Sequence, residues 1–89
     1  MWQWDEDKRQ INLTKHGVDF AAVDNFDWST AVRWADARFD YGENREVALG
    51  LIGARIYYLA FTRRGHDIRI ISLRKANTRE QAIWNMHVK

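Results

Sequence analysis

The chain has 89 residues, carries 14 Lys and Arg against 12 Asp and Glu, and contains neither cysteine nor proline. This length suits one domain, residues 1–89, with a single core. The absence of cysteine excludes a disulfide framework and a thiolate metal site. No apolar run is long enough to span a membrane and the N-terminus lacks a signal pattern, so we expect a cytoplasmic protein.

Charge is unevenly distributed along the chain. Residues 1–46 hold ten acidic and six basic side chains, a balance of −4, whereas residues 47–89 hold two acidic and eight basic ones, a balance of +6. A basic half points to an anionic partner. The alternative, exposed sheet residues that happen to be basic, stays open because charge alone does not decide between the two.

Two helices are predicted near the N-terminus, after a short extended entry. Asp5 is a good N-cap and Gly17 suits the left-handed residue that ends a helix, which predicts a first helix at Glu6–His16. Its few apolar anchors are Ile11 and Leu13. A second helix follows, capped by Asp19 and ended by Asn25 and Asp27, with its inward side chains at Phe20, Val23 and Phe26.

Strands occupy the middle of the chain. The alternation and turn residues predict an outer strand at 28–38, a loop at 40–44, strands at 46–52 and 55–63 around a turn at 53–54, and a strand beginning at 67 after a turn at 64–66. The last helix begins at Asn77 or Thr78, both of which have capping-box spacing, and its inward residues are Ile83 and Met86.

The strand beginning at Asp67 is predicted to be central in the sheet, because apolar residues fall on both of its faces. Strict alternation assigns its residues to two faces, one with Ile68, Ile70 and Ser72, the other with Arg69, Ile71 and Leu73. Arg69 is unusual in such a strand, since a guanidinium is rarely buried without a partner. Its side chain is therefore either paired internally or part of a polar surface.

This order of elements predicts an α+β fold: a small antiparallel sheet of about four strands, with two N-terminal helices and one C-terminal helix. Runs of one element type, rather than alternation, favour helices gathered on one face of the sheet.

The motifs along these elements resemble the BrnT family, the ribonuclease toxins of bacterial BrnT/BrnA toxin–antitoxin pairs. The resemblance covers nearly the full chain in order and is carried by Trp4, Asp5, Lys8, Asn12, residues 15–18, Phe20, Phe26, Asp27, Arg45, Leu49, Gly50, residues 67–72, residues 74–76 and Glu80. It implies a RelE-like fold, RNA cleavage without a metal or cofactor, inhibition of translation, and a hetero-oligomer with a BrnA-type antitoxin, through which any DNA contact would be indirect. The sequence departs from the family at Trp84, where relatives usually have a Tyr, and an indole cannot serve as acid or base.

Metal-free RNA cleavage needs a proton acceptor for the 2′-hydroxyl, positive charge at the phosphate and a proton for the leaving 5′-oxygen. Our candidates for the phosphate are Arg69, Arg74 and Lys75, with Arg45 arriving from another strand. Alternation separates Arg69 from Arg74 unless pairing stops near Ser72. The structural alternative is an internal ion pair, for instance of Arg69 with Glu46 or Asp67.

His16 is the candidate for proton transfer, since its ordinary pKa is near neutrality, but a His at a helix C-terminus is often only a cap that complements the dipole. Candidate RNA-binding residues are Lys15, Arg63, Arg64 and Tyr58. The side chain that stacks on a base is Tyr58 or its neighbour Tyr57, with Trp34 as a further alternative. The histidines have no metal-ligand spacing, so we expect no metal site. Two other functions stay open: a non-catalytic RNA-binding module and a protein-interaction module.

Overall fold

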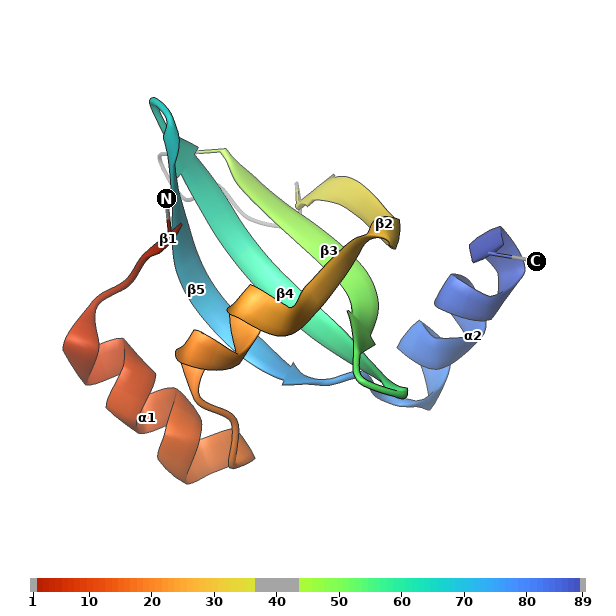
Figure 1. Ribbon diagram of the computed structural model, residues 1–89, viewed down its shortest axis with the longest axis horizontal. Coiled ribbons are helices and arrows are strands. Elements are labelled where there is room, and N and C mark those ends of the chain that lie inside the picture. The colour runs from red at the N-terminus through yellow and green to blue at the C-terminus, as the bar shows by residue number, and fades with distance from the viewer. Residues whose placement is uncertain (1, 37–43, 89) are drawn as a thin grey trace.

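The computed structural model describes residues 2–36 and 44–88, which form a mixed sheet flanked by helical segments (Figure 1). In chain order the elements are β1 Trp2–Gln3, α1 Glu6–His16, the 3-10 helix η1 Phe20–Asn25, β2 Phe26–Asp36, β3 Arg45–Ile52, β4 Arg55–Arg64, β5 Asp67–Lys75 and α2 Thr78–Val88. Most of the predicted loop at 40–44, and the end of the predicted strand at 28–38, lie outside the described residues. No described helix has both the length and the apolar character that crossing a membrane requires.

The α+β class is confirmed, but the predicted sheet of about four antiparallel strands is wrong in two respects. The sheet has five strands in the order β1-β5-β4-β3-β2, and β1 runs parallel to β5. The extra strand is the chain entry, where Trp2 lies opposite Ile68 and Gln3 opposite Arg69. β2 is an outer strand, as predicted. β5 lies inside the sheet, although β1 covers only the first part of its edge.

The first helix has the predicted bounds, and local chemistry explains both ends. The Asp5 carboxylate accepts hydrogen bonds from the backbone N–H groups of Asp7 and Lys8, at 2.8 and 3.2 Å. Gly17 adopts φ 70°, a left-handed conformation that glycine reaches without a steric penalty, and its N–H donates to the Leu13 carbonyl at 2.8 Å. The helix is thus closed at both ends by residues that the sequence identifies.

The second predicted helix is a 3-10 helix, η1. Asp19 caps it by accepting from the N–H of Ala21 at 3.0 Å, and Phe20, Val23 and Phe26 are buried as predicted. The segment is short because Phe26 is already the first residue of β2. Few residues lie between the Asp19 cap and that strand, which suits the tighter 3-10 geometry.

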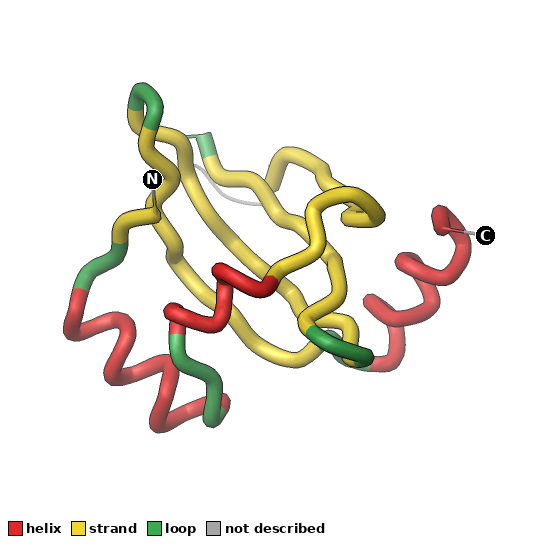
Figure 2. Tube along the Cα trace, in the orientation of Figure 1, coloured by secondary structure: helices red, strands yellow, loops and turns green. Residues whose placement is uncertain are grey.

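The expectation that all helices gather on one face of the sheet is wrong. One core cluster joins η1 to the sheet through Phe20, Val23, Ala48 and Phe61, and we call this side the η1 face. A second cluster on the opposite side, the α2 face, packs Ile83 and Trp84 of α2 against Leu49, Leu51, Ile56, Tyr58 and Ala76. Figures 1 and 2 show η1 crossing in front of the strands, with α1 beside β5 and α2 at the far end of the sheet.

α2 begins at Thr78, and of the two predicted capping boxes the structure forms the one at Asn77. The Asn77 side chain accepts from the N–H of Glu80 at 2.8 Å, and the Glu80 carboxylate accepts from the N–H of Asn77 at 2.9 Å, which is a capping box. The predicted inward position of Met86 is wrong, since its side chain is 78% exposed. Trp84 is the second residue that α2 packs against the sheet, beside Ile83.

α1 contradicts the prediction for its apolar side chains. Ile11 is 64% and Leu13 37% exposed, whereas the polar Asn12 between them is only 6% exposed. The Asn12 amide donates to the carbonyls of Leu73 at 2.7 Å and Val18 at 2.9 Å, and its oxygen accepts from the N–H of Leu73 at 3.3 Å. β1 pairs with only the first part of β5, so within the described chain the backbone groups of Leu73 have no neighbouring strand on that edge. Asn12 supplies their hydrogen bonds, which is why the helix turns Asn12 inward.

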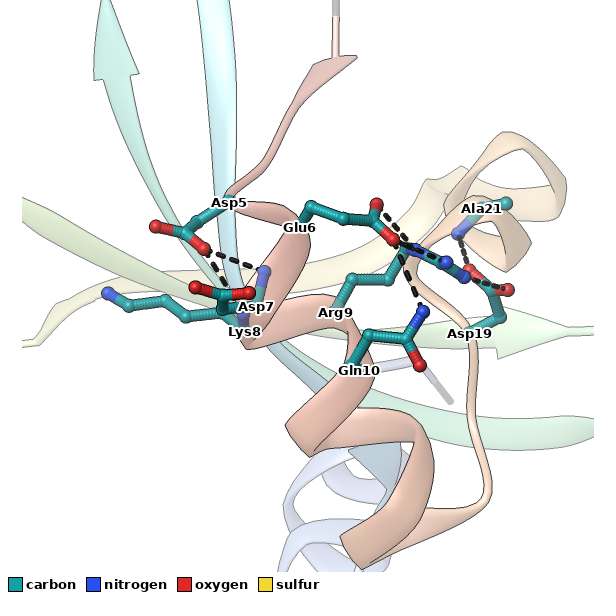
Figure 3. A network of polar contacts seen from close by, with 8 residues as sticks. All are labelled: Asp5, Glu6, Asp7, Lys8, Arg9, Gln10, Asp19 and Ala21. Carbon is teal, nitrogen blue, oxygen red and sulfur yellow. Dashed lines mark hydrogen bonds and ion pairs between the residues drawn. The ribbon is translucent and has the colours of Figure 1, made fainter.

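Arg9 joins α1 to the segment before η1 (Figure 3). Its guanidinium donates to Glu6 one turn earlier and to Asp19 at 2.8 Å. The hydrogen bond from Arg9 lowers the pKa of Glu6 to about 2. This network fixes the angle at which the chain leaves α1.

Candidate functional site

A β-bulge at Ile71 decides which residues of β5 face the same way. β4 and β5 pair as Ala60 with Ser72 and then as Phe61 with Ile70, so Ile71 is an extra residue on β5. The two faces predicted by strict alternation are therefore wrong, because Ile70 and Leu73 both lie in the core cluster of the η1 face. Arg69 and Arg74, which alternation separated, belong to the same α2 face.

The register extends this arrangement across the sheet. Arg69 lies opposite Thr62, and Thr62 lies opposite Arg45 on β3. Arg74 lies opposite Tyr58, farther along the same face. The structure thus brings Arg45, Arg69, Arg74 and Tyr58 to one face.

Arg74 is the most firmly held of these cations. Its guanidinium carbon lies 3.9 Å from the centre of the Tyr58 ring, a cation–π contact. Two of its nitrogens donate to the two Glu80 oxygens at 2.7 and 3.0 Å, a bidentate pair. Since a guanidinium has five N–H donors, this pairing leaves others for a ligand. Glu80 is a site residue that the sequence-based candidate list did not include, although its capping-box spacing marked it as a structured position.

Arg69 is held more loosely. Its side chain is 30% exposed, and one of its nitrogens lies 4.0 Å from the Asp5 carboxylate, beyond hydrogen-bonding distance. Two other carboxylates near this strand contact other residues: Glu46 pairs with Arg63 at 2.8 Å, and Asp67 accepts from Gln3 at 2.9 Å. Among the described residues, Arg69 therefore forms no tight internal ion pair.

His16 ends α1 next to this face. Burial lowers its pKa below the ordinary value, and the positive charges of Lys15 and Arg74 lower it further. A His that served to complement the helix dipole would be stabilised in its charged form, and its pKa would be raised. The imidazole is instead favoured in its neutral form at pH 7, the form that accepts a proton.

His16 lies in a groove between α1 and β5, about 180 Å³ in volume. The residues that line this α1–β5 groove are Lys8, Ile11, Asn12, Lys15, His16, Ile71 and Ser72. Three of these side chains are basic or titrate near neutrality, and none is acidic. Lys15 is exposed on the helix side of the groove, as expected for a residue that meets an anion.

A larger cleft of about 450 Å³ lies between α2 and strands β2 to β4. It is lined by Trp34, Ala35, Asp36, Val47, Tyr58, Arg79, Glu80 and Ile83. Trp34 is 39% exposed there, and Tyr58 forms another aromatic wall. Exposed aromatic surface of this kind suits the stacking of a nucleobase.

Three predicted site residues lie elsewhere. Arg63 projects from the η1 face, where it pairs with Glu46 and lies 5.7 Å from the centre of the Phe61 ring. Lys75, opposite Tyr57, also belongs to the η1 face and is exposed. Arg64 is exposed at the end of β4. Strand alternation places Arg63 and Lys75 away from Arg69 and Arg74.

Trp84 does not line this site as a free side chain. It packs in the second core cluster, and its indole Nε1 is buried without a hydrogen-bond partner among the described residues. The residue acts here as part of the packing between α2 and the sheet.

Residues 4–80 match a family model whose description is "Ribonuclease toxin, BrnT, of type II toxin-antitoxin system". The match spans α1 and the whole sheet beyond β1, and it ends at Glu80 in the first turn of α2. No match is found among curated proteins.

Proposed function

The chain belongs to the BrnT family of type II toxin–antitoxin systems, and we propose that it cleaves RNA without a metal ion, by attack of a 2′-hydroxyl on the adjacent phosphate. Family membership makes it an endoribonuclease with RNA as substrate and a cognate antitoxin as partner. We further propose that the fold is RelE-like, that cleavage inhibits translation, and that a BrnA-type antitoxin neutralises the protein in a hetero-oligomer.

The observation that carries this proposal is the arrangement of cations on the α2 face. The bulge at Ile71 brings Arg69 and Arg74 to one face, and Glu80 holds the Arg74 guanidinium over Tyr58. A guanidinium held in place before substrate arrives stabilises charge developing on a phosphate without reorganising in the transition state.

The spacing along β4 supports a different phosphate for each of the two arginines. Thr62, opposite Arg69, and Tyr58, opposite Arg74, are four residues apart, so the two arginines lie about 14 Å apart along the sheet at ~3.4 Å per residue. This is a backbone separation, but the two side chains also turn to different carboxylates, Arg69 toward Asp5 and Arg74 to Glu80, which supports separate phosphates. We propose that Arg74, which lies close enough to His16 to lower its pKa, faces the scissile phosphate. Arg69 and Arg45 then hold the RNA backbone on one side of it.

His16 is the proposed base. Its neutral imidazole removes the 2′-hydroxyl proton, the 2′-oxygen bonds to phosphorus, and the bond to the 5′-oxygen breaks. The products are a 2′,3′-cyclic phosphate and a 5′-hydroxyl that takes its proton from solvent. Arg74 stabilises the negative charge that gathers on the phosphate oxygens.

The experiment is RNA cleavage by the purified protein in the presence of a chelator, with analysis of the product ends. We expect cleavage with cyclic phosphate and 5′-hydroxyl ends. His16→Ala and Arg74→Ala should each lower the rate about 100-fold or more. Arg55→Ala, an exposed cation at the start of β4 whose strand position assigns it to the η1 face, is the matched control. RNA that stays intact at high protein concentration, or cleavage that returns only with a divalent ion, contradicts the proposal.

Glu80 is proposed as a positioning residue for Arg74. A Gln at this position still satisfies a capping box, but it replaces the charged bidentate partner with a neutral one. Glu80→Gln should therefore leave the helix content and unfolding midpoint nearly unchanged and lower kcat more than it raises KM. A variant that unfolds would indicate a purely structural role, and one with unchanged kcat would remove Glu80 from the site.

A further inference from the structure

The exposed side of α1 carries a stripe that the proposed chemistry does not use. Lys8, Ile11 and Lys15 follow one another at helical spacing and therefore share one side of the helix. Ile11 is 64% exposed, the second most exposed large apolar side chain after Met86 among the described residues. Figure 3 shows the Lys8 side chain extending away from the Arg9 network, so its ammonium is not drawn into that cluster.

The stripe faces hollows on both of its sides. The α1–β5 groove lies between it and Ile71 of β5. A second, shallower hollow of about 320 Å³ runs along Gln10, Ile11, Thr14 and Lys15 on the same helix. Ile11 and Lys15 line both, so the two hollows form one continuous surface, apolar at its centre and basic at its ends.

The chemistry of this surface favours a protein over RNA. Single-stranded RNA is bound through aromatic stacking and through cations that follow the backbone, and the exposed Trp34 and the half-buried Tyr58 line the α2-face cleft instead. An isoleucine at the centre offers neither a stacking plane nor a hydrogen bond. An exposed aliphatic side chain with charged residues around it is typical of the centre and rim of a protein interface.

We propose that the Lys8–Ile11–Lys15 stripe and the α1–β5 groove dock the cognate antitoxin, through an apolar side chain flanked by carboxylates. This inference rests on the proposed function, because the partner it names is the antitoxin of this toxin. The apolar side chain packs on Ile11 and Ile71, and the carboxylates pair with Lys8 and Lys15. Because His16 lines the same groove, an antitoxin seated there covers the proposed base and prevents cleavage.

The inward Asn12 supports this interpretation. It anchors α1 to β5 with hydrogen bonds, so α1 does not need Ile11 for its own packing. The helix therefore keeps an apolar side chain at the surface without losing its attachment to the sheet. Burying that side chain is favourable only when a partner covers it.

The test compares antitoxin affinity with RNA cleavage by the free toxin in the same variants. The probe is the purified cognate antitoxin, titrated calorimetrically. Ile11→Ser and Lys8→Glu should each weaken antitoxin binding about tenfold or more. Both should lower antitoxin affinity by a larger factor than they change cleavage in the absence of antitoxin. Leu13→Ser, an exposed apolar residue on the other side of α1, and Arg55→Glu, an exposed cation on β4, are the matched controls and should leave both readouts unchanged.

The outcomes separate this inference from the proposed function. Unchanged antitoxin affinity in Ile11→Ser and Lys8→Glu overturns it. Loss of RNA binding or cleavage with unchanged antitoxin affinity also overturns it and makes the groove an RNA surface. If the wild-type protein binds antitoxin through this stripe but cleaves no RNA, the proposed function fails and the docking surface stands.

Discussion

Replacing Asn12 tests the link between the fold and the site most directly. Its side chain makes three hydrogen bonds to the backbone, two of them to Leu73, and it is 6% exposed. In Asn12→Ala the N–H and carbonyl of Leu73 and the carbonyl of Val18 lose their partner in a buried place. The same change loosens α1 beside the strand that carries Arg74.

The expected cost follows from those backbone groups. A buried polar group left without a partner costs roughly 1–3 kcal/mol, and water entering the space recovers part of that cost. We therefore expect Asn12→Ala to lower the free energy of unfolding by about 3 kcal/mol, a large share of the ~5–15 kcal/mol that holds a domain of this size. Asn12→Asp has the same shape but turns a carboxylate toward two carbonyl oxygens, so it should be worse than Ala at pH 7.

Urea unfolding followed by circular dichroism measures both changes. The Asn12→Asp deficit should shrink as the pH falls and the carboxyl is protonated, since the neutral acid regains one donor. Asn85→Ala, an exposed asparagine on α2, is the control and should change stability by less than about 0.5 kcal/mol. An Asn12→Ala protein that loses less than about 1 kcal/mol would refute the view that this amide replaces a strand at the β5 edge.

Three further predictions concern other parts of the chain. A Cβ at Gly50 would lie 2.5 Å from the buried Phe26 ring, so Gly50→Ala should destabilise the protein by about 1–3 kcal/mol in urea unfolding. Arg9→Ala should raise the pKa of Glu6 from about 2 toward its ordinary value of 4.5 in a carboxyl NMR titration. Because the pKa of Glu6 is lowered in the folded protein, its contact with Arg9 stabilises the fold above pH 4.5, and this stabilisation is lost as the pH falls through about 2. The stability of Arg9→Ala should not show this pH-dependent decrease. The acid limb of the cleavage rate should have its midpoint below the ordinary His pKa of 6.5, and His16→Ala should abolish that limb.

Features governed by neighbouring residues could be predicted from the sequence. The bounds of α1 follow from a carboxylate cap at one end and a left-handed glycine at the other, both within one turn of the helix. The start of α2 follows in the same way from Asn77 and Glu80, and the edge position of β2 from its loose alternation. The family was also evident from ordered motifs, and the match over residues 4–80 confirms it.

Features set by distant residues could not be predicted in this way. α1 turns a polar side chain inward and its apolar side chains outward, because Leu73 at the edge of β5, sixty-one residues from Asn12, needs the hydrogen bonds of that amide. β1 becomes a strand only because the start of β5 offers it an edge, and two residues contain too little pattern to show this. Glu80 was visible as a cap, but its second contact, with Arg74, depends on where α2 begins relative to β5.

The sequence of β5 contains evidence for the bulge, which a prediction from strict alternation overlooks. Ile70 and Leu73 are three residues apart, and Arg69 and Arg74 five, so unbroken alternation would place the members of each pair on opposite faces. One arginine would then lie on the packed η1 face, at the cost of burying a charge, and one large aliphatic residue would leave the core. A single extra residue at Ile71 resolves both conflicts at once, because it reverses the parity between the two halves of the strand. The packing of the core and the alignment of the arginines that we propose bind RNA therefore depend on the same local irregularity.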